Sequence, residues 1–164
     1  MSSIGVLFAV TVDEVAELEA RAGSDELADF VSEEIEERDD PGQSFDLDKA
    51  WDALHRCLTD GTLDVGAGTF PLNAAVLGRG TLDAGEEYFV GLTRAADVPA
   101  VAAALAAVDE TFLRHAYRTV LPADYAPEYG EDDLEYTVGS FEGLPGFWQA
   151  ATASGRSVIF TVSQ

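Results

Sequence analysis

The sequence predicts a single α+β domain covering residues 1–164, and three observations lead to this class. Segments rich in β-branched and aromatic residues lie at the start, middle and end of the chain, near residues 4–10, 88–93 and 157–162. About six to eight predicted helices separate them, without regular alternation of strand and helix. Apolar residues make up 47% of the chain, which is enough for a hydrophobic core at this length.

The first strand and the two helices after it are marked by short-range signals. Residues 4–10 form a mostly apolar run that is typical of a buried strand. Thr11 and Glu14 have the spacing of a capping box, which predicts a helix over about residues 12–22. A second helix is expected over residues 26–38, where apolar side chains recur at helical spacing until an Asp-Asp-Pro-Gly sequence ends the pattern.

The middle of the chain carries a third amphipathic pattern. It predicts a helix over residues 47–59, with Asp46 as its N-cap. The apolar stripe of this helix consists of Leu47, Ala50, Trp51, Leu54 and Leu58. A short helix over residues 72–77, begun by Pro71, and a turn over residues 79–86 then lead to the middle strand.

The second half of the chain is predicted to be mainly helical. The expected helices cover residues 98–108, 110–119, 131–141 and 146–153. Asp109 is placed to cap the second of them, which should turn Phe112, Leu113, Ala116 and Tyr117 inward. An ordered loop with two prolines is expected over residues 122–130.

The chain is strongly acidic, with nine basic and 31 acidic residues and a formal net charge of −22. Such a charge repels phosphates and anionic lipid headgroups, so we expect no nucleic-acid partner and no membrane partner. It favours a basic partner, and solubility alone is the competing explanation. Lys49 is the only lysine beside eight arginines, which suggests a role that arginine cannot fill.

Several kinds of site are absent from the sequence. Cys57 is the only cysteine, and with His55 and His115 as the only histidines it can form neither an intrachain disulfide nor a thiolate zinc site. The chain lacks a phosphate-binding loop, a dinucleotide fingerprint and a Gly-x-Ser-x-Gly elbow, so we expect no metal and no cofactor. The N-terminal apolar run is too short for a secretory signal, which predicts a cytoplasmic protein.

The predicted third helix contains the side chains that are best suited to bind a ligand or to take part in catalysis. Trp51 lies on its apolar stripe, and His55 lies one turn later at the edge, which Asp48 and Asp52 share. An imidazole beside carboxylates can act as a base or donate a hydrogen bond near neutral pH. Asp48, Lys49, Trp51 and His55 are therefore the candidate ligand-pocket residues, although Lys49 points to the opposite side and needs another element to cover it. The competing interpretation is that Trp51 and His55 are packing residues.

The chain resembles the YfbM-like bacterial family in three blocks of sequence. Residues 47–55 and 58–61 are similar to the family motif LDKxWxxLH…LTG, except that Asp60 precedes the glycine. Residues 71–78 are similar to the second block and residues 89–93 to the third. The resemblance covers nearly the whole chain and implies a compact α+β fold of bacterial cytoplasmic proteins. It implies no activity, because the family is one of unknown function.

Two classes of function follow from these observations. The first, which we favour, is a non-catalytic binding or interaction protein whose acidic surface recognises a basic partner protein. The alternative is a small-molecule-binding or enzymatic site around the 47–55 helix. The sequence offers no motif that assigns a catalytic residue, and so it favours a role other than catalysis.

Overall fold

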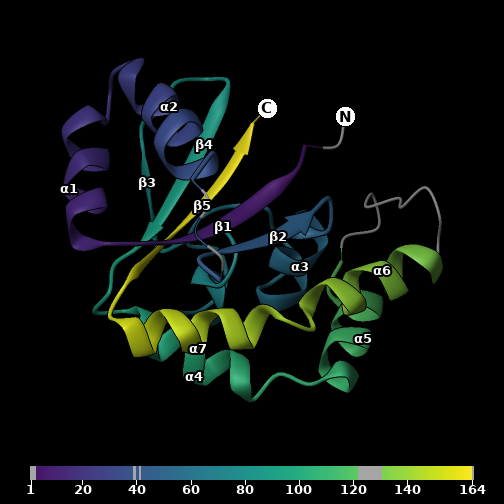
Figure 1. Ribbon diagram of the computed structural model, residues 1–164. Helices are drawn as coiled ribbons and strands as arrows, with labels where there is room; N and C mark the ends of the chain where they lie inside the picture. The colour runs from purple at the N-terminus through teal and green to yellow at the C-terminus, as the bar shows by residue number, and fades with distance from the viewer. Residues whose placement is uncertain (1–2, 39, 41, 122–130, 164) are drawn as a thin grey trace.

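Five strands form one antiparallel sheet within the residues that the computed structural model describes, 3–38, 40, 42–121 and 131–163 (Figure 1). The strands are β1 (Gly5–Val10), β2 (Ser44–Asp48), β3 (Gly80–Leu82), β4 (Tyr88–Thr93) and β5 (Ser157–Ser163). Their order across the sheet is β2-β1-β5-β4-β3, so the last strand of the chain is the central one. Leu7 of β1 and Gly91 of β4 both lie opposite Phe160 of β5.

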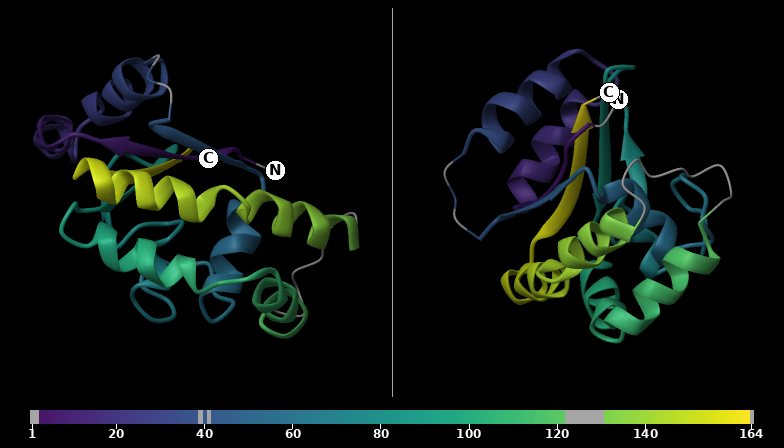
Figure 2. Two further views of the ribbon diagram at one scale, coloured as in Figure 1. Left: turned by 60° about the horizontal axis from the view of Figure 1, so that its bottom comes forward. Right: turned by 90° about the vertical axis from the view of Figure 1, so that its right-hand side faces the viewer.

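Helices cover both faces of this sheet, as Figure 2 shows. The α-helices are α1 (Val12–Arg21), α2 (Glu26–Phe30), α3 (Trp51–Leu58), α4 (Val98–Ala106), α5 (Glu110–Thr119), α6 (Glu131–Phe141) and α7 (Leu144–Ser154). A π-helix, η1 (Val31–Glu36), continues α2, and a 3₁₀ turn, η2 (Leu72–Ala74), precedes β3. The α+β class and the strands predicted near residues 4–10, 88–93 and 157–162 are confirmed.

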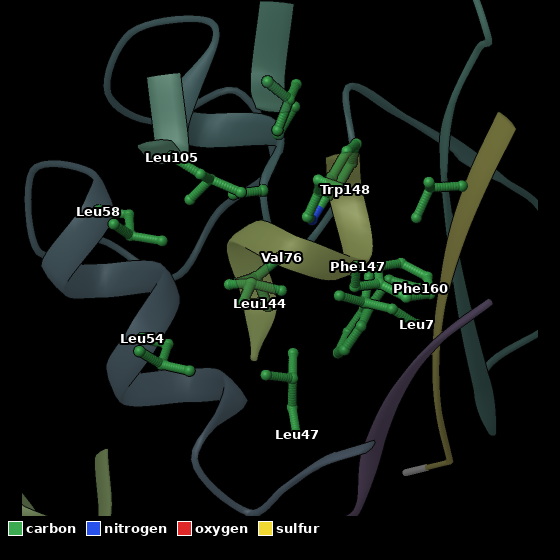
Figure 3. Close-up of a cluster of buried hydrophobic side chains, with 14 of the residues drawn as sticks. Leu7, Leu47, Leu54, Leu58, Val76, Leu105, Leu144, Phe147, Trp148 and Phe160 are labelled. Atoms are coloured by element: carbon green, nitrogen blue, oxygen red, sulfur yellow. The ribbon is translucent and has the colours of Figure 1, made fainter. Parts of the chain in front are cut away.

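The two faces of the sheet belong to two separate hydrophobic clusters. Along β1, Leu7 packs with the cluster beneath α3, α4 and α7, whereas Phe8 packs with the cluster beneath α1, α2 and η1. Successive side chains of a strand point to opposite faces, so a strand covered on both sides must be apolar at nearly every position. This explains the apolar run of β1 and the mostly apolar sequence of β5. Figure 3 shows the first cluster, in which Trp148 is fully buried.

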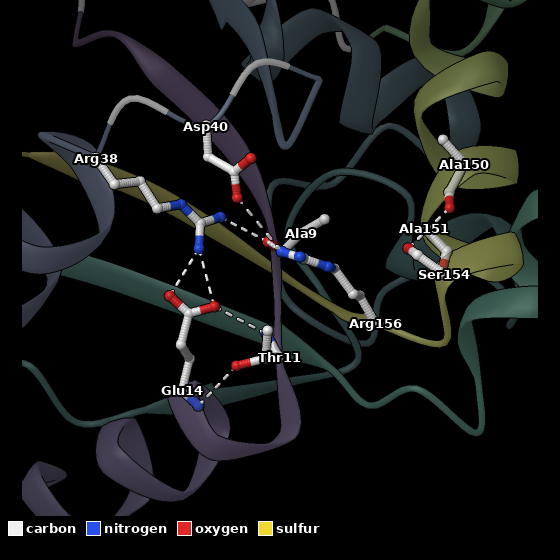
Figure 4. A network of polar contacts seen from close by, with 9 residues as sticks. All are labelled: Ala9, Thr11, Glu14, Arg38, Asp40, Ala150, Ala151, Ser154 and Arg156. Atoms are coloured by element: carbon white, nitrogen blue, oxygen red, sulfur yellow. Dashed lines mark hydrogen bonds and ion pairs between the residues drawn. The ribbon is translucent and has the colours of Figure 1, made fainter.

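A network of charged groups fixes the corner between β1 and α1 (Figure 4). The capping box forms as predicted, with Thr11 N donating to Glu14 Oε1 at 2.9 Å and Glu14 N donating to Thr11 Oγ1 at 3.1 Å. Arg38, just after η1, donates to Glu14 Oε2 and to the Ala9 carbonyl, each at 2.6 Å. Arg156 also reaches the Ala9 carbonyl, at 3.4 Å. The helix pair α2–η1 is thereby attached to the sheet.

The predicted helix over residues 47–59 is wrong in its first turn. Residues 44–48 form the edge strand β2, and α3 begins only at Trp51. Asp46, expected as an N-cap, instead accepts a hydrogen bond from Asp48 N at 2.7 Å, and Asp48 has a positive φ of 47°. Pairing with β1 overrides the helical pattern here, because short apolar patterns fit a strand as well as a helix.

Other boundaries also differ from the prediction. Strand β3 occupies part of the segment predicted as a turn, and the short helix expected over residues 72–77 is reduced to η2. Phe112, predicted to face inward, is 43% exposed, while Leu113 and Ala116 are buried as expected. The predicted loop over residues 122–130 lies outside the described residues. None of the described helices is long and apolar enough to cross a membrane.

Candidate functional site

A small cavity of about 220 Å³ lies between the start of α3, the loop after it and the strands β4 and β5. It is lined by Trp51, Leu63, Asp64, Val65, Leu77, Phe89 and Val162. The register of the sheet places two of these side chains together, because Phe89 of β4 lies opposite Val162 of β5. The cavity therefore combines segments that lie far apart in the sequence.

Trp51, the first residue of α3, forms one wall of the cavity. Its Nε1 donates to the Ser3 carbonyl at 2.9 Å, and its ring packs against Phe160 with 5.6 Å between the centroids. Gly5 lies behind both rings: a Cβ atom there would come within 2.8 Å of Trp51 and 2.7 Å of Phe160. The indole is thus held on one side by the sheet and presents its remaining surface to the cavity.

His55 lies one turn further along α3 and is fully buried. Its Nε2 lies 3.1 Å from the carbonyl oxygen of Asp64, which can only accept, so Nε2 carries the proton and donates. No described group hydrogen-bonds to Nδ1. Burial lowers the pKa of His55 below its ordinary value, against the opposing effect of the Asp64 hydrogen bond. His55 is not in the lining, and it holds the loop that carries Asp64.

The other two predicted residues lie elsewhere. Asp48 and Lys49 are both exposed and are not among the residues that line the cavity. The Lys49 backbone N–H donates to the Tyr136 hydroxyl of α6 at 3.2 Å. Burial, followed by a hydrogen bond to Asp48, raises the pKa of Tyr136. Because β2 ends at Asp48, the helical spacing that grouped these residues with His55 does not apply.

Asp52, which the sequence places beside His55, forms an ion pair with Arg56 at 2.6 Å. The structure thus brings together Trp51 and His55 from the predicted pocket residues and separates Asp48 and Lys49 from them. Sequence reasoning missed the loop residues Leu63, Asp64 and Val65. These three residues alternate between apolar and acidic, but this pattern does not indicate which element the loop packs against.

The charges of the described surface follow a simple pattern. Every arginine forms an ion pair with a carboxylate of the same chain, at residues 21, 38, 56, 79, 94, 114, 118 and 156. In the described residues Lys49 has no such pair. Since acidic residues outnumber basic ones by 31 to nine, most carboxylates are left without a cation of their own. Nowhere in the described ranges do three or more His, Cys, Asp or Glu side chains form a group that could hold a metal ion.

An antiparallel sheet between two helical layers, with a small cavity beside β4 and β5, defines this protein as an α+β domain. The chain belongs to the family described as "Domain of unknown function (DUF1877)", whose model matches residues 1–161. Its fold is similar to the crystal structure of YfbM from Escherichia coli, a protein of unknown function, with a TM-score of 0.69 and 22% sequence identity. The match covers 97% of this chain and 99% of the other. No curated protein matches the sequence. The resemblance to the YfbM-like family is confirmed.

Proposed function

We propose that this protein is a non-catalytic binding protein whose acidic surface recognises a basic partner protein. The observation that carries the proposal is the distribution of ion pairs. Each arginine is already matched with a carboxylate of its own chain, and exposed glutamates such as Glu33, Glu34 and Glu37 lie outside the ion pairs of the described residues. A surface of one sign accelerates association with a partner of the opposite sign and fixes its orientation.

The densest run of acidic residues lies on η1 and its end. Glu33, Glu34 and Glu37 are exposed, and Arg38 next to them is turned inward to Glu14. This part of the surface therefore presents carboxylates without an adjacent free cation among the described residues. The three glutamates are the first place at which to reduce the charge.

The test is a pull-down from native lysate at about 50 mM and about 500 mM salt, with mass spectrometry of the bound proteins. We expect a basic protein to be retained at low salt and released at high salt. After purification, that basic protein should bind the triple variant Glu33→Gln/Glu34→Gln/Glu37→Gln more weakly than the unmodified protein, with a slower association rate. The matched Asp variant of the same three positions keeps the charge and should bind normally. Recovery of no basic protein at low salt contradicts the proposal.

A second function, small-molecule binding, is favoured by the cavity at Trp51. Apolar walls with a single polar group are the usual form of a ligand site. A thermal-shift screen with small amines, alcohols and carboxylic acids tests it, because bound compounds raise the melting temperature. Val65→Trp fills the cavity and should abolish any such shift. Lys49→Ala is the control and should keep it, since Lys49 lies outside the lining. A library without any stabilising compound contradicts this function.

A further inference from the structure

The cavity at Trp51 has a chemical character that selects among small molecules. We propose that it binds a small organic cation, an ammonium group carried on an aromatic or branched apolar body. This inference rests on the small-molecule function proposed above and names its ligand class. Three features carry it: the apolar walls, the single acidic residue among them, and the aromatic rings of Trp51 and Phe89.

The walls determine the size and body of the bound molecule. Six of the seven lining residues are apolar, and they come from α3, the loop after it, the segment before β3, and the strands β4 and β5. The volume of about 220 Å³ is below the range of about 300–1,000 Å³ that holds drug-sized ligands. A single ring or a short branched chain is therefore the body that fits.

The charge at the rim of the cavity, which is formed by Asp64 and the loop after α3, determines the sign of the ligand's charge. Asp64 is the only ionisable residue in the lining, and it is exposed to solvent. Asp60 belongs to the same loop and accepts a hydrogen bond from Thr62 N at 3.0 Å, and hydrogen bonds from Thr62 lower the pKa of its carboxyl. Arg56, which also contacts this loop, donates to the Gly61 carbonyl and to Asp52. A cation is thus attracted to the rim, whereas a carboxylic acid is repelled.

The aromatic residues add an attraction that a neutral ligand lacks. Trp51 and Phe89 line the cavity from different elements, and both rings pack against Phe160, with 5.6 Å and 6.0 Å between centroids. Aromatic faces attract ammonium groups electrostatically, and tryptophan does so most strongly. The net charge of −22 also concentrates cations near the surface.

His55 holds the loop that carries Asp64 in a fixed position. Its Nε2–H donates to the Asp64 carbonyl, and its own carbonyl accepts from the Thr59 hydroxyl at 2.8 Å. The loop after α3 is in this way attached to the helix at two points, Thr59 at its start and Asp64 further along. His55 therefore acts as a positioning residue for the carboxylate, and its buried ring does not touch the cavity contents.

The experiment compares three probes that share one ring: 2-phenylethylammonium, 2-phenylethanol and phenylacetate. Calorimetric titrations at about 50 mM salt should show that the ammonium binds roughly tenfold more tightly than the alcohol, with the acid weakest, because of the charge at the rim. Asp64→Asn should remove most of the ammonium's advantage over the alcohol, leaving only the smaller part that comes from the aromatic rings and the net charge, and should leave alcohol binding unchanged. The matched control, Asp48→Asn, removes the same charge outside the cavity and should keep the preference.

Two outcomes overturn the inference and are distinguishable from each other. Equal binding of ammonium and alcohol by the unmodified protein refutes the ligand class while the cavity remains a binding site. Absence of binding of every probe up to about 10 mM refutes the small-molecule function as well. Val65→Trp should lose all three probes, and circular dichroism should show that each variant is folded.

Discussion

Gly91, in the middle of β4, offers the sharpest test of how the sheet packs. A Cβ atom at this position would lie 1.8 Å from the carbonyl oxygen of Leu77 and 2.8 Å from its carbonyl carbon. Carbon and oxygen atoms approach to about 3.3 Å in ordinary contacts, so Gly91→Ala requires a separation of roughly 1.5 Å. No rotamer change can provide it, because the obstructing atoms are backbone.

To make room for the Cβ atom, β4 would have to move away from Leu77, although β4 is paired with a strand on each side. Gly91 lies opposite Thr81 of β3 and Phe160 of β5, and the neighbouring Leu92 carbonyl accepts a hydrogen bond from Arg79 N at 3.1 Å. Overpacking costs about 1–3 kcal/mol, and one weakened hydrogen bond adds about 1 kcal/mol. We therefore expect Gly91→Ala to lower the free energy of unfolding by about 3 kcal/mol.

Urea denaturation followed by circular dichroism measures this change, and thermal melting should show a drop of roughly 6–12 °C for a chain of this size. Gly139→Ala is the matched control. Gly139 lies inside α6, and a Cβ atom there would meet nothing within 4 Å, so alanine should stabilise by about 0.5–1 kcal/mol. Equal unfolding midpoints for Gly91→Ala and the unmodified protein would refute this packing.

Three further predictions concern single side chains. Glu14→Gln should lower the free energy of unfolding by about 1–3 kcal/mol, because the carboxylate accepts from both Arg38 and the helix cap; Glu17→Gln, in an exposed pair, should leave the urea midpoint unchanged. Burial lowers the pKa of His55 in the folded protein, so on acidification the imidazole is protonated in the unfolded chain before it is protonated in the folded one. The free energy of unfolding should therefore fall as the pH drops below about 6.5, by at most about 1.4 kcal/mol per pH unit. Urea titrations between pH 7.5 and 5.5, about the ordinary histidine pKa, should lose this slope in His55→Gln and keep it in a variant of the exposed His115; an unchanged slope in His55→Gln contradicts the assignment. Burial raises the pKa of Cys57 to about 12, so a thiol reagent should label it only after denaturant is added, and rapid labelling of the native protein would show that the core is open.

Some features of this protein follow from local sequence alone. The capping box at Thr11 and Glu14 predicted the start of α1 because its hydrogen bonds join residues three positions apart. Asp109 capped α5 for the same reason, with its carboxylate accepting from Phe112 N at 2.8 Å. The apolar run of residues 4–10 predicted a buried strand, because a strand covered on both faces has few positions for polar side chains, and β1 is buried at nearly every position.

The residues of the candidate site could be predicted only in part from local sequence spacing. Trp51 and His55 lie one turn apart as predicted, because both belong to α3, where the helical spacing holds. Asp48 and Lys49 lie apart from them, because β2 extends to Asp48 and the helical spacing does not hold there. The apolar pattern of residues 45–50 fits either a strand or a helix, and only the pairing of Phe45 with Leu7 decides between them.

The sequence by itself determined the α+β class, the acidic net charge and most of the helices, because composition and hydrogen bonds within one helical turn are local properties. The tertiary structure alone decided that β5 is central, that β2 is a strand, and that a cavity lies beside Trp51. The first two depend on strand pairing, and the cavity brings together Trp51, Asp64, Phe89 and Val162 from four different segments of the chain. Strand order and register set these contacts, and neither is encoded in any short segment of the chain.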